Sequence, residues 1–138
     1  MRRTAGWEPD MVDRDRLDEF LKGRRWAVVG ASKDRTKFGN ITFRELQMRG
    51  KQVYPINRKS REIEGVTCYP SLSALPEPVD RVLIVVPPKQ SEAVVKEADA
   101  AGIDSVWFQP GAESDAALEY CEAHGMVAIA GHCILHTR

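Results

Sequence analysis

The residues most suited to chemistry follow an apolar run, at the point where a strand would end. There the sequence reads Gly30-Ala31-Ser32, and a second glycine follows at Gly39. Small residues let a ligand approach the main chain, and Ser32 adds a hydroxyl group that can donate a hydrogen bond. A helix beginning near Gly39 would present free N–H groups and a positive dipole end, which favour phosphate. The pattern predicts a phosphate-binding loop, although the G-x-G-x-x-G signature of dinucleotide sites is absent.

Cationic side chains occur within the same loop. Lys33, Arg35 and Lys37 would place positive charge beside a bound phosphate. A plainer interpretation is that Gly30 only allows a strand and a helix to pack closely, and that the charges are solvated. Both interpretations stay open on the sequence alone.

A second polar cluster follows the apolar run at 52–57. Asn57-Arg58-Lys59 stands where an NAD site usually carries an acidic residue for the adenosine ribose. Two cations there suit a phosphorylated ribose, as in NADP or coenzyme A, and disfavour NAD. An ordinary exposed basic turn would have the same composition.

Two further strand ends complete the candidate rim. Pro87-Pro88 forms either a flat apolar wall for an adenine or a simple helix entry. Gln109 offers a polar tip and Gly111 allows close approach, just before a helix that Ser114 is expected to cap.

The elements that would position these residues alternate along the chain. Strands buried on both faces are expected at 26–30, 52–57, 81–87, 105–111 and 126–131. Helices are expected at about 13–23, 39–49, 89–101 and 114–124, and the last three are followed by Gly50, Gly102 and Gly125. The irregular stretch 61–80 should hold a short strand near Cys68 and a brief helix near Ser71–Leu75. Trp107 is expected in the core.

This alternation predicts one α/β domain over residues 1–138. We expect a doubly wound, mainly parallel, five- to six-stranded Rossmann-like sheet with helices on both faces. Ligands of such sheets bind outside the carboxyl ends of the strands, so the loops described above would converge on one rim.

As a set, several segments resemble small stand-alone CoA-binding domain proteins, which are relatives of the CoA-binding domain in the succinyl-CoA synthetase alpha subunit. The resemblance covers about 24–136 and rests on "AVVGAS", "VYPIN", "GVTCYPSLSALPEPVDRV", "PP", "WFQPG" and "GHCIL". It implies that coenzyme A lays its phosphates on the first loop and helix start, with adenosine between the second and third strand ends. The candidate cofactor-binding residues are Gly30, Ala31, Ser32, Lys37, Phe38, Gly39, Asn57, Arg58, Lys59, Val86, Pro87, Pro88, Gln109 and Gly111.

The chain departs from the pattern of those proteins at three points. Arg58 stands where proline is frequent, and Val86 stands where an arginine often precedes the double proline. Gly131-His132-Cys133 replaces the usual Asp-Arg-Cys. The exchanges affect the ribose contacts and the pocket floor, while the phosphate loop is unchanged. The position of Cys133 suggests a mixed disulfide with the CoA thiol as a hypothesis.

No catalytic residues are expected. A dehydrogenase needs an acid or base in a substrate pocket, usually in a second domain, and no residues are left over for one. The synthetase relatives use a phosphorylated histidine in a further domain. His132, Cys133 and His136 are not expected to bind a metal, because adjacent residues of a strand point to opposite faces.

The sequence therefore predicts non-enzymatic binding of coenzyme A or acyl-CoA. The alternatives are an NADP-binding oxidoreductase-like protein and a nucleotide-responsive regulatory module. Lys plus Arg and Asp plus Glu both number 20, so no general attraction to nucleic acid or membrane is implied. The three cysteines include no C-x-x-C pair, and we find no signal peptide or membrane span, so a cytoplasmic location is expected. A homodimer or an unidentified protein partner stays possible.

Overall fold

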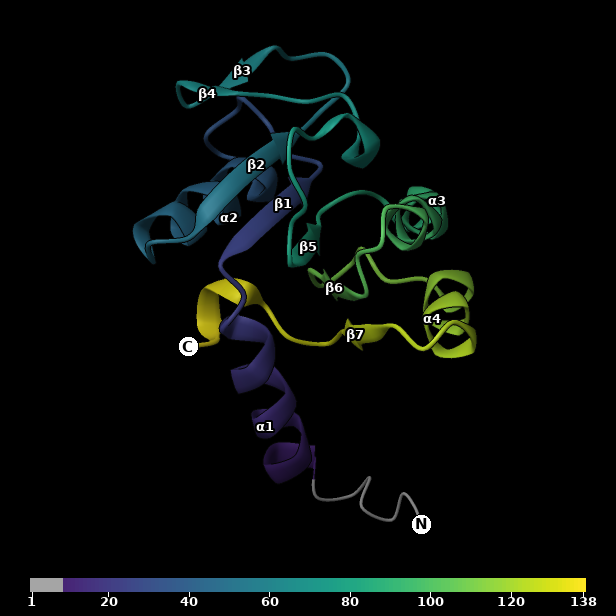
Figure 1. Ribbon diagram of the computed structural model, residues 1–138. Coiled ribbons are helices and arrows are strands. Elements are labelled where there is room, and N and C mark those ends of the chain that lie inside the picture. Colours follow the sequence, from purple (N-terminus) through teal and green to yellow (C-terminus); the bar gives the residue numbers. More distant parts are fainter. Residues whose placement is uncertain (1–8) are drawn as a thin grey trace.

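The computed structural model describes residues 9–138, and side chains from residue 14 onward. Residues 1–8 of the expected domain lie outside the described part. Five strands form one sheet in the order β2-β1-β5-β6-β7, and every neighbouring pair is parallel. Their bounds are β1 Arg25–Val29, β2 Gln52–Ile56, β5 Arg81–Ile84, β6 Ser105–Phe108 and β7 Val127–Ile129. The predicted doubly wound, Rossmann-like sheet is confirmed, with five strands (Figure 1).

Helices cover both faces of this sheet (Figure 1). They are α1 Pro9–Leu21, α2 Phe38–Met48, α3 Pro88–Ala100 and α4 Asp115–Ala123. Successive residues of β1 point into two different cores. Ala27 packs in the core beneath α3 and α4, whereas Trp26 packs in the core beneath α1 and α2. Trp107 lies fully buried in the second core, as predicted.

Glycines end the three helices that follow strands, as predicted. Gly50, Gly102 and Gly125 have φ values of 82°, 80° and 68°, in the left-handed region that glycine adopts without strain. Ser114 caps α4 by accepting a hydrogen bond from the N–H of Ala117 at 3.1 Å. Helix α1 begins earlier and ends two residues sooner than the predicted 13–23.

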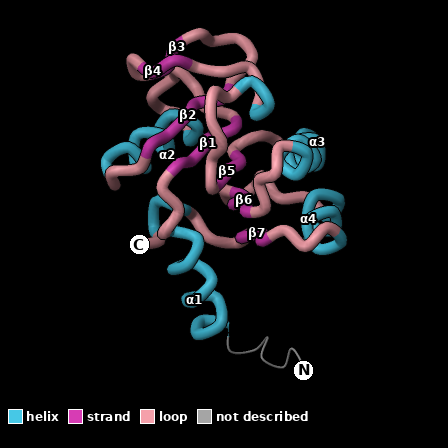
Figure 2. Tube along the Cα trace, in the orientation of Figure 1, coloured by secondary structure: helices cyan, strands magenta, loops and turns pink. Residues whose placement is uncertain are grey.

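The irregular stretch after β2 forms a separate hairpin, drawn mostly as loop in Figure 2. Strands β3, Glu62–Ile63, and β4, Val66–Thr67, pair antiparallel, and Tyr69 forms a single parallel bridge with Ile56 of β2. A 3-10 turn, η2, spans Leu72–Ala74. The expected short strand near Cys68 and brief helix at 71–75 are thus both present, close to their predicted positions.

The C-terminal segment differs from its prediction. Strand β7 ends at Ile129, and Gly131, with φ 83°, turns the chain away from the extended strand. A 3-10 turn, η3, follows at Ile134–His136. The alternation argument used against a metal site therefore does not apply to His132 and Cys133, since neither lies in a strand. Within residues 9–138, no cluster of three or more His, Cys, Asp or Glu side chains is placed to hold a metal ion.

None of the described helices is long and apolar enough to cross a bilayer.

Candidate functional site

The order of the strands locates the site. The chain passes from β1 outward to β2 and then returns to β5 on the other side of β1, so the winding direction reverses between β1 and β5. Ligands of open α/β sheets bind outside the carboxyl ends of the strands at such a switch point. Here the loop 30–37 follows β1, and the segment 85–87 follows β5.

At this switch point three backbone segments touch directly. Gly30, with φ 100°, lies against the carbonyl group of Val85, and a Cβ atom on Gly30 would overlap that carbonyl oxygen. A Cβ atom on Gly39 would overlap the carbonyl oxygen of Gly30 in the same way. Both glycines are therefore required by close packing. Gly30 therefore has a packing role, which leaves phosphate binding by the same loop open, and the contact of Gly39 places the first turn of α2 directly over the end of β1.

The first turn of α2 leaves donors available. Lys37 occupies the N-cap position without a side-chain capping bond. Within the described residues, the N–H groups of Phe38 and Gly39 have no hydrogen-bond acceptor. Free N–H groups at a helix start, together with the helix dipole, attract an anion. The sequence-predicted phosphate position therefore has unused donors.

Local hydrogen bonds shape the loop before α2. Ser32 Oγ accepts from the N–H of Asp34 at 3.0 Å, so its hydroxyl proton is free to donate elsewhere. Asp34 Oδ1 accepts from Thr36 Oγ1 at 2.7 Å and from the Thr36 N–H at 3.0 Å. These bonds, with Lys37 nearby, lower the pKa of Asp34. The Asp34 side chain therefore stabilises the loop through hydrogen bonds within it.

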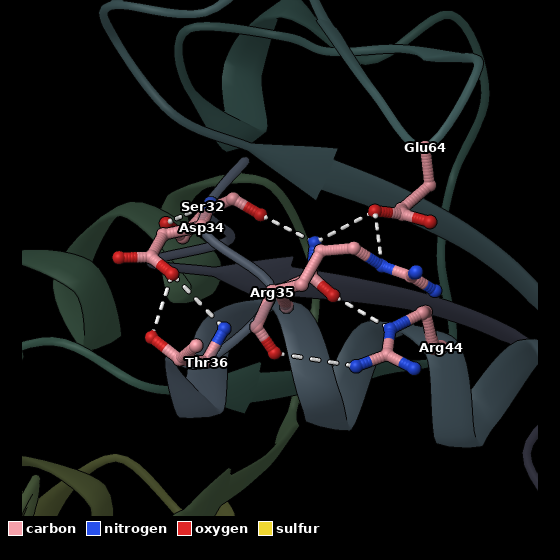
Figure 3. Close-up of polar contacts among 7 residues, drawn as sticks. Ser32, Asp34, Arg35, Thr36, Arg44 and Glu64 are labelled. Atoms are coloured by element: carbon pink, nitrogen blue, oxygen red, sulfur yellow. Dashed lines mark hydrogen bonds and ion pairs between the residues drawn. The ribbon is translucent and has the colours of Figure 1, made fainter.

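The buried amide of Asn40 ties this loop to its surroundings, among them Arg44 and Glu64 (Figure 3). Asn40, fully buried in α2, donates through Nδ2 to the Ser32 carbonyl at 2.9 Å and to Glu64 Oε2 at 3.0 Å. Its Oδ1 accepts from Arg44 Nε at 2.7 Å, and Arg44 Nη2 donates to the Arg35 carbonyl at 3.3 Å. The loop is therefore held at two carbonyl groups.

Asn57 joins the second strand end to the first. Its Nδ2 donates to the Ala31 carbonyl at 2.7 Å, and its Oδ1 accepts from the N–H of Lys59 at 2.7 Å. The second bond makes a tight Asx-type turn that presents Arg58 and Lys59 at the rim. Asn57 thus has a structural role that its pattern in the sequence did not reveal.

A large pocket of about 820 Å³ opens between the ends of β1 and β2 and helix α3. Arg58, Lys59 and Lys89 bring positive charge to it, and Glu97 is the one acid in its lining. Glu97 is engaged with Ser73, whose N–H and hydroxyl lie 3.4 Å from its Oε2. The lining is completed by Val29, Gly30, Ile56, Asn57, Pro70, Ser71, Val86, Gln90, Ala93 and Val94. This pocket combines apolar walls with a net positive charge.

A smaller pocket of about 230 Å³ lies beyond Val86, which lines both. Its walls are mainly apolar, and Phe38 in them is 58% exposed. Gln109 Nε2 lies 3.4 Å from Cys133 Sγ, while Gln109 Oε1 accepts from the buried N–H of Ile134 at 2.7 Å. The remaining lining residues are Val85, Pro110, Gly111 and Ala112.

The candidate residues fall into four groups. The large pocket contains Gly30, Asn57, Arg58, Lys59 and Val86, and the small pocket contains Phe38, Val86, Gln109 and Gly111. The loop after β1 and the start of α2 contain the third group, which is Ala31, Ser32, Lys37 and Gly39. Pro87 and Pro88 begin α3 and line neither pocket, which agrees with the helix-entry interpretation.

One wall of the large pocket was missed by the sequence reasoning. It is formed by the face of α3 that carries Lys89, Gln90, Ala93, Val94 and Glu97. Their spacing of three and four residues marks one helical face, so the signal was present in the sequence. The helix was predicted from the spacing of Val94, Ala98 and Ala101, and of these only Val94 lines the pocket.

The cysteines differ in their surroundings. All three are free. Burial raises the pKa of Cys121 to about 11 and also raises the pKa of Cys68, so both thiols are poor nucleophiles at neutral pH. Cys133 is half-buried and is the cysteine that faces a pocket.

The fold and its switch-point pockets define the chain as a Rossmann-like α/β protein. More narrowly, the chain belongs to the CoA binding domain family, whose model matches residues 24–138. The acetate–CoA ligase [ADP-forming] II subunit alpha of Pyrococcus furiosus is 38% identical over 91 residues, which are 65% of this chain and 20% of the ligase subunit. Acetate–CoA ligase [ADP-forming] I of Archaeoglobus fulgidus is 35% identical over 78% of this chain and 17% of the ligase. The chain thus spans about a fifth of the length of these relatives.

Similar proteins of comparable size also exist. A conserved hypothetical protein from Pyrococcus furiosus is 46% identical, with a TM-score of 0.78 over 81% of this chain and 97% of that one. A hypothetical protein from Pyrococcus horikoshii is 31% identical, with a TM-score of 0.85 over 88% of this chain and 87% of that one. The fold of this chain therefore also occurs as a separate small protein.

Proposed function

We propose that this protein binds coenzyme A or acyl-CoA without catalysing a reaction on it. The observation that carries the proposal is the pair of unequal pockets that flank Val86 at the switch point. Coenzyme A is a long molecule with a bulky, phosphorylated nucleotide at one end and a slender thiol arm at the other. A large cationic pocket and a small, mainly apolar pocket that share Val86 match that shape.

Each part of the ligand has a candidate position. The adenosine and its 3′-phosphate would occupy the large pocket, where Arg58, Lys59 and Lys89 offer charge-assisted hydrogen bonds. The diphosphate would lie at the Gly30 loop and the start of α2. The thiol, with any short acyl group, would enter the small pocket beside Cys133.

The absence of an assigned catalytic role is part of the proposal. The polar side chains of the site that are hydrogen-bonded hold loops in place, as Asn57 and Gln109 do. We propose a carrier, sensor or accessory subunit in the cytoplasm, acting alone, as a homodimer or with another protein.

Calorimetric titration with CoA, dephospho-CoA and NADPH tests the proposal. CoA should bind most tightly, and removal of the 3′-phosphate should weaken binding about tenfold, as expected for loss of a charge-assisted contact. The double variant Arg58→Ala, Lys59→Ala should bind CoA and dephospho-CoA almost equally. Lys22→Ala, at an exposed position just after α1 and outside both pockets, serves as a control for the loss of a positive charge elsewhere on the surface.

The alternative is an NADP-binding oxidoreductase-like protein or a nucleotide-responsive module. The same pair of cations at Arg58 and Lys59 favours it, because NADP also carries a phosphorylated ribose. Tight binding of NADPH with no binding of CoA would replace the CoA proposal with this one.

A further inference from the structure

The tip of the β3–β4 hairpin has an unusual backbone. Glu64 has φ 51° and is the one non-glycine residue with positive φ in the described part of the chain. Gly65 follows with φ 76°, and the register pairs Ile63 with Val66. Positive φ at both central residues is typical of two-residue type I′ hairpin turns, which favour Asn or Gly in the first position. A glutamate there is strained, and such strain often accompanies a functional constraint.

The strained residue faces the phosphate loop (Figure 3). Glu64 Oε2 accepts a hydrogen bond from Asn40 Nδ2 at 3.0 Å and lies 3.4 Å from Arg35 Nε. The Glu64 side chain is only 23% exposed, although it sits at the tip of a surface hairpin. The carboxylate therefore forms a bridge between the hairpin and the loop that follows β1.

Two charged neighbours give the Asn40 amide one orientation. The Glu64 carboxylate can only accept hydrogen bonds, and the Arg44 guanidinium can only donate them. Glu64 therefore selects the NH₂ end of Asn40, and Arg44 selects its oxygen. The second proton of the same NH₂ group is then directed to the Ser32 carbonyl, 2.9 Å away.

Fixing that carbonyl also fixes the next N–H group. The peptide between Ser32 and Lys33 is trans, so its N–H points away from Asn40. Within the described residues, this N–H of Lys33 has no acceptor. It is an additional donor beside the free N–H groups of Phe38 and Gly39.

We propose that Glu64 is a positioning residue of the phosphate loop. Through Asn40 it sets the peptide plane at Ser32, so that the loop is already ordered before an anionic ligand arrives. A preorganised loop loses less conformational entropy on binding, so the ligand binds more tightly. The inference rests on the proposed function, because the diphosphate of CoA is the group that the loop would receive.

Two amide variants of Glu64 distinguish the hydrogen bond to Asn40 from the preference of the hairpin turn for certain residues. Glu64→Gln keeps an oxygen that can accept from Asn40, whereas Glu64→Asn is too short to reach it and suits the type I′ turn better. We expect Glu64→Asn to keep or raise the melting temperature while weakening CoA binding about tenfold, a typical effect of losing a charge-assisted hydrogen bond. Glu64→Gln should stay within about threefold of the unmodified chain.

The matched control is Glu62→Gln, which removes a carboxylate from an exposed position on the same hairpin. Affinity for CoA that is unchanged in Glu64→Asn, or weakened equally in Glu62→Gln, would overturn the proposal. If the unmodified chain binds no CoA, the proposed function fails, and the positioning role of Glu64 is tested by hydrogen exchange of the backbone amides at 33–36. Faster exchange in Glu64→Asn than in Glu62→Gln would then support that role, and equal exchange would reject it.

Discussion

At the start of α2, the Cα of Gly39 rests against the carbonyl oxygen of Gly30, with no side chain between them. We expect Gly39→Ala to push the helix away from β1, because the added methyl group would overlap backbone atoms that cannot rotate aside. Overpacking of this kind costs about 1–3 kcal/mol of unfolding free energy. The free energy of CoA binding should lose more than the free energy of unfolding does. Denaturant unfolding and calorimetry measure the two effects.

Gly50→Ala is the comparison for that experiment. Gly50 has φ 82°, but nothing lies within 4 Å of a Cβ atom added there. This variant should lose about 1–2 kcal/mol through left-handed strain and bind CoA normally. Equal loss of binding in both variants would show that general destabilisation, and not the contact at Gly30, controls the site.

A pH-dependent contact joins the N-terminal ends of two strands. Asp80 accepts from the N–H groups of Arg24 and Arg25 at 2.9 and 3.0 Å, and these bonds lower its pKa below the ordinary value of 3.8. The stabilisation is therefore present above that pH and is lost as the pH falls through the lowered pKa.

We expect Asp80→Asn to lower stability at neutral pH by at most about 1 kcal/mol, since solvent screens this exposed carboxylate. The difference from the unmodified chain should shrink as the pH falls below 3.8, where the native carboxyl group becomes protonated. Thermal melts of both proteins across pH 3 to 7, a window of roughly four units, would measure it. A difference in stability between the two proteins that stays constant with pH would contradict the role given to the carboxylate.

Among the elements, the C-terminal segment is held by the buried Gln109 amide, together with bonds that Trp107 and Arg49 donate to the carbonyl groups of His132 and Ile134. Gln109 Oε1 accepts from the N–H of Ile134, and both residues are nearly inaccessible to solvent. We expect Gln109→Ala to cost about 1–3 kcal/mol, because the buried N–H would lose its acceptor. Gln47→Ala is the control, since the Gln47 side chain makes no hydrogen bond within the described residues. Similar unfolding free energies for the two variants would argue against this anchor.

The elements themselves were largely predictable from the sequence. Continuous apolar runs marked the strands, and Gly50, Gly102 and Gly125 marked the helix ends, because both signals are local. The segment after Ile129 was not predictable in this way. It packs through Gln109 and Ile134, a contact between residues far apart in the chain, which no local pattern encodes.

The candidate site was predictable only where its residues follow strands. Gly30, Asn57 and Val86 could be placed by the rule that parallel strands end at one rim. The role of Asn57 in holding Ala31 was not foreseen, since it depends on the distance between two loops. Glu64 also escaped notice, because a hairpin tip carries no periodic signal.

For the molecule as a whole, charge is balanced but unevenly placed. Lys plus Arg equals Asp plus Glu, so salt dependence of binding would come from local cations, namely those of the large pocket and those of the loop 30–37. We expect CoA affinity to fall roughly tenfold between about 50 and 500 mM NaCl, as screening shortens the reach of those charges. The dependence of CoA affinity on salt concentration should be weaker in the double variant Arg58→Ala, Lys59→Ala. A salt-independent affinity in the unmodified chain would place the phosphates away from both groups of cations.

The contact between Gly30 and Gly39 involves main-chain atoms only. This part of the backbone geometry is therefore independent of the side chains that line the pockets. We expect exchanges at pocket-lining positions such as 58 or 133 to alter which ligand the pockets prefer while leaving this main-chain contact in place. If the proposed binding holds, the same backbone should accept different nucleotide-bearing ligands after a few side chains of the pocket lining are replaced, which would make this small domain a practical starting point for engineering new ligand selectivity.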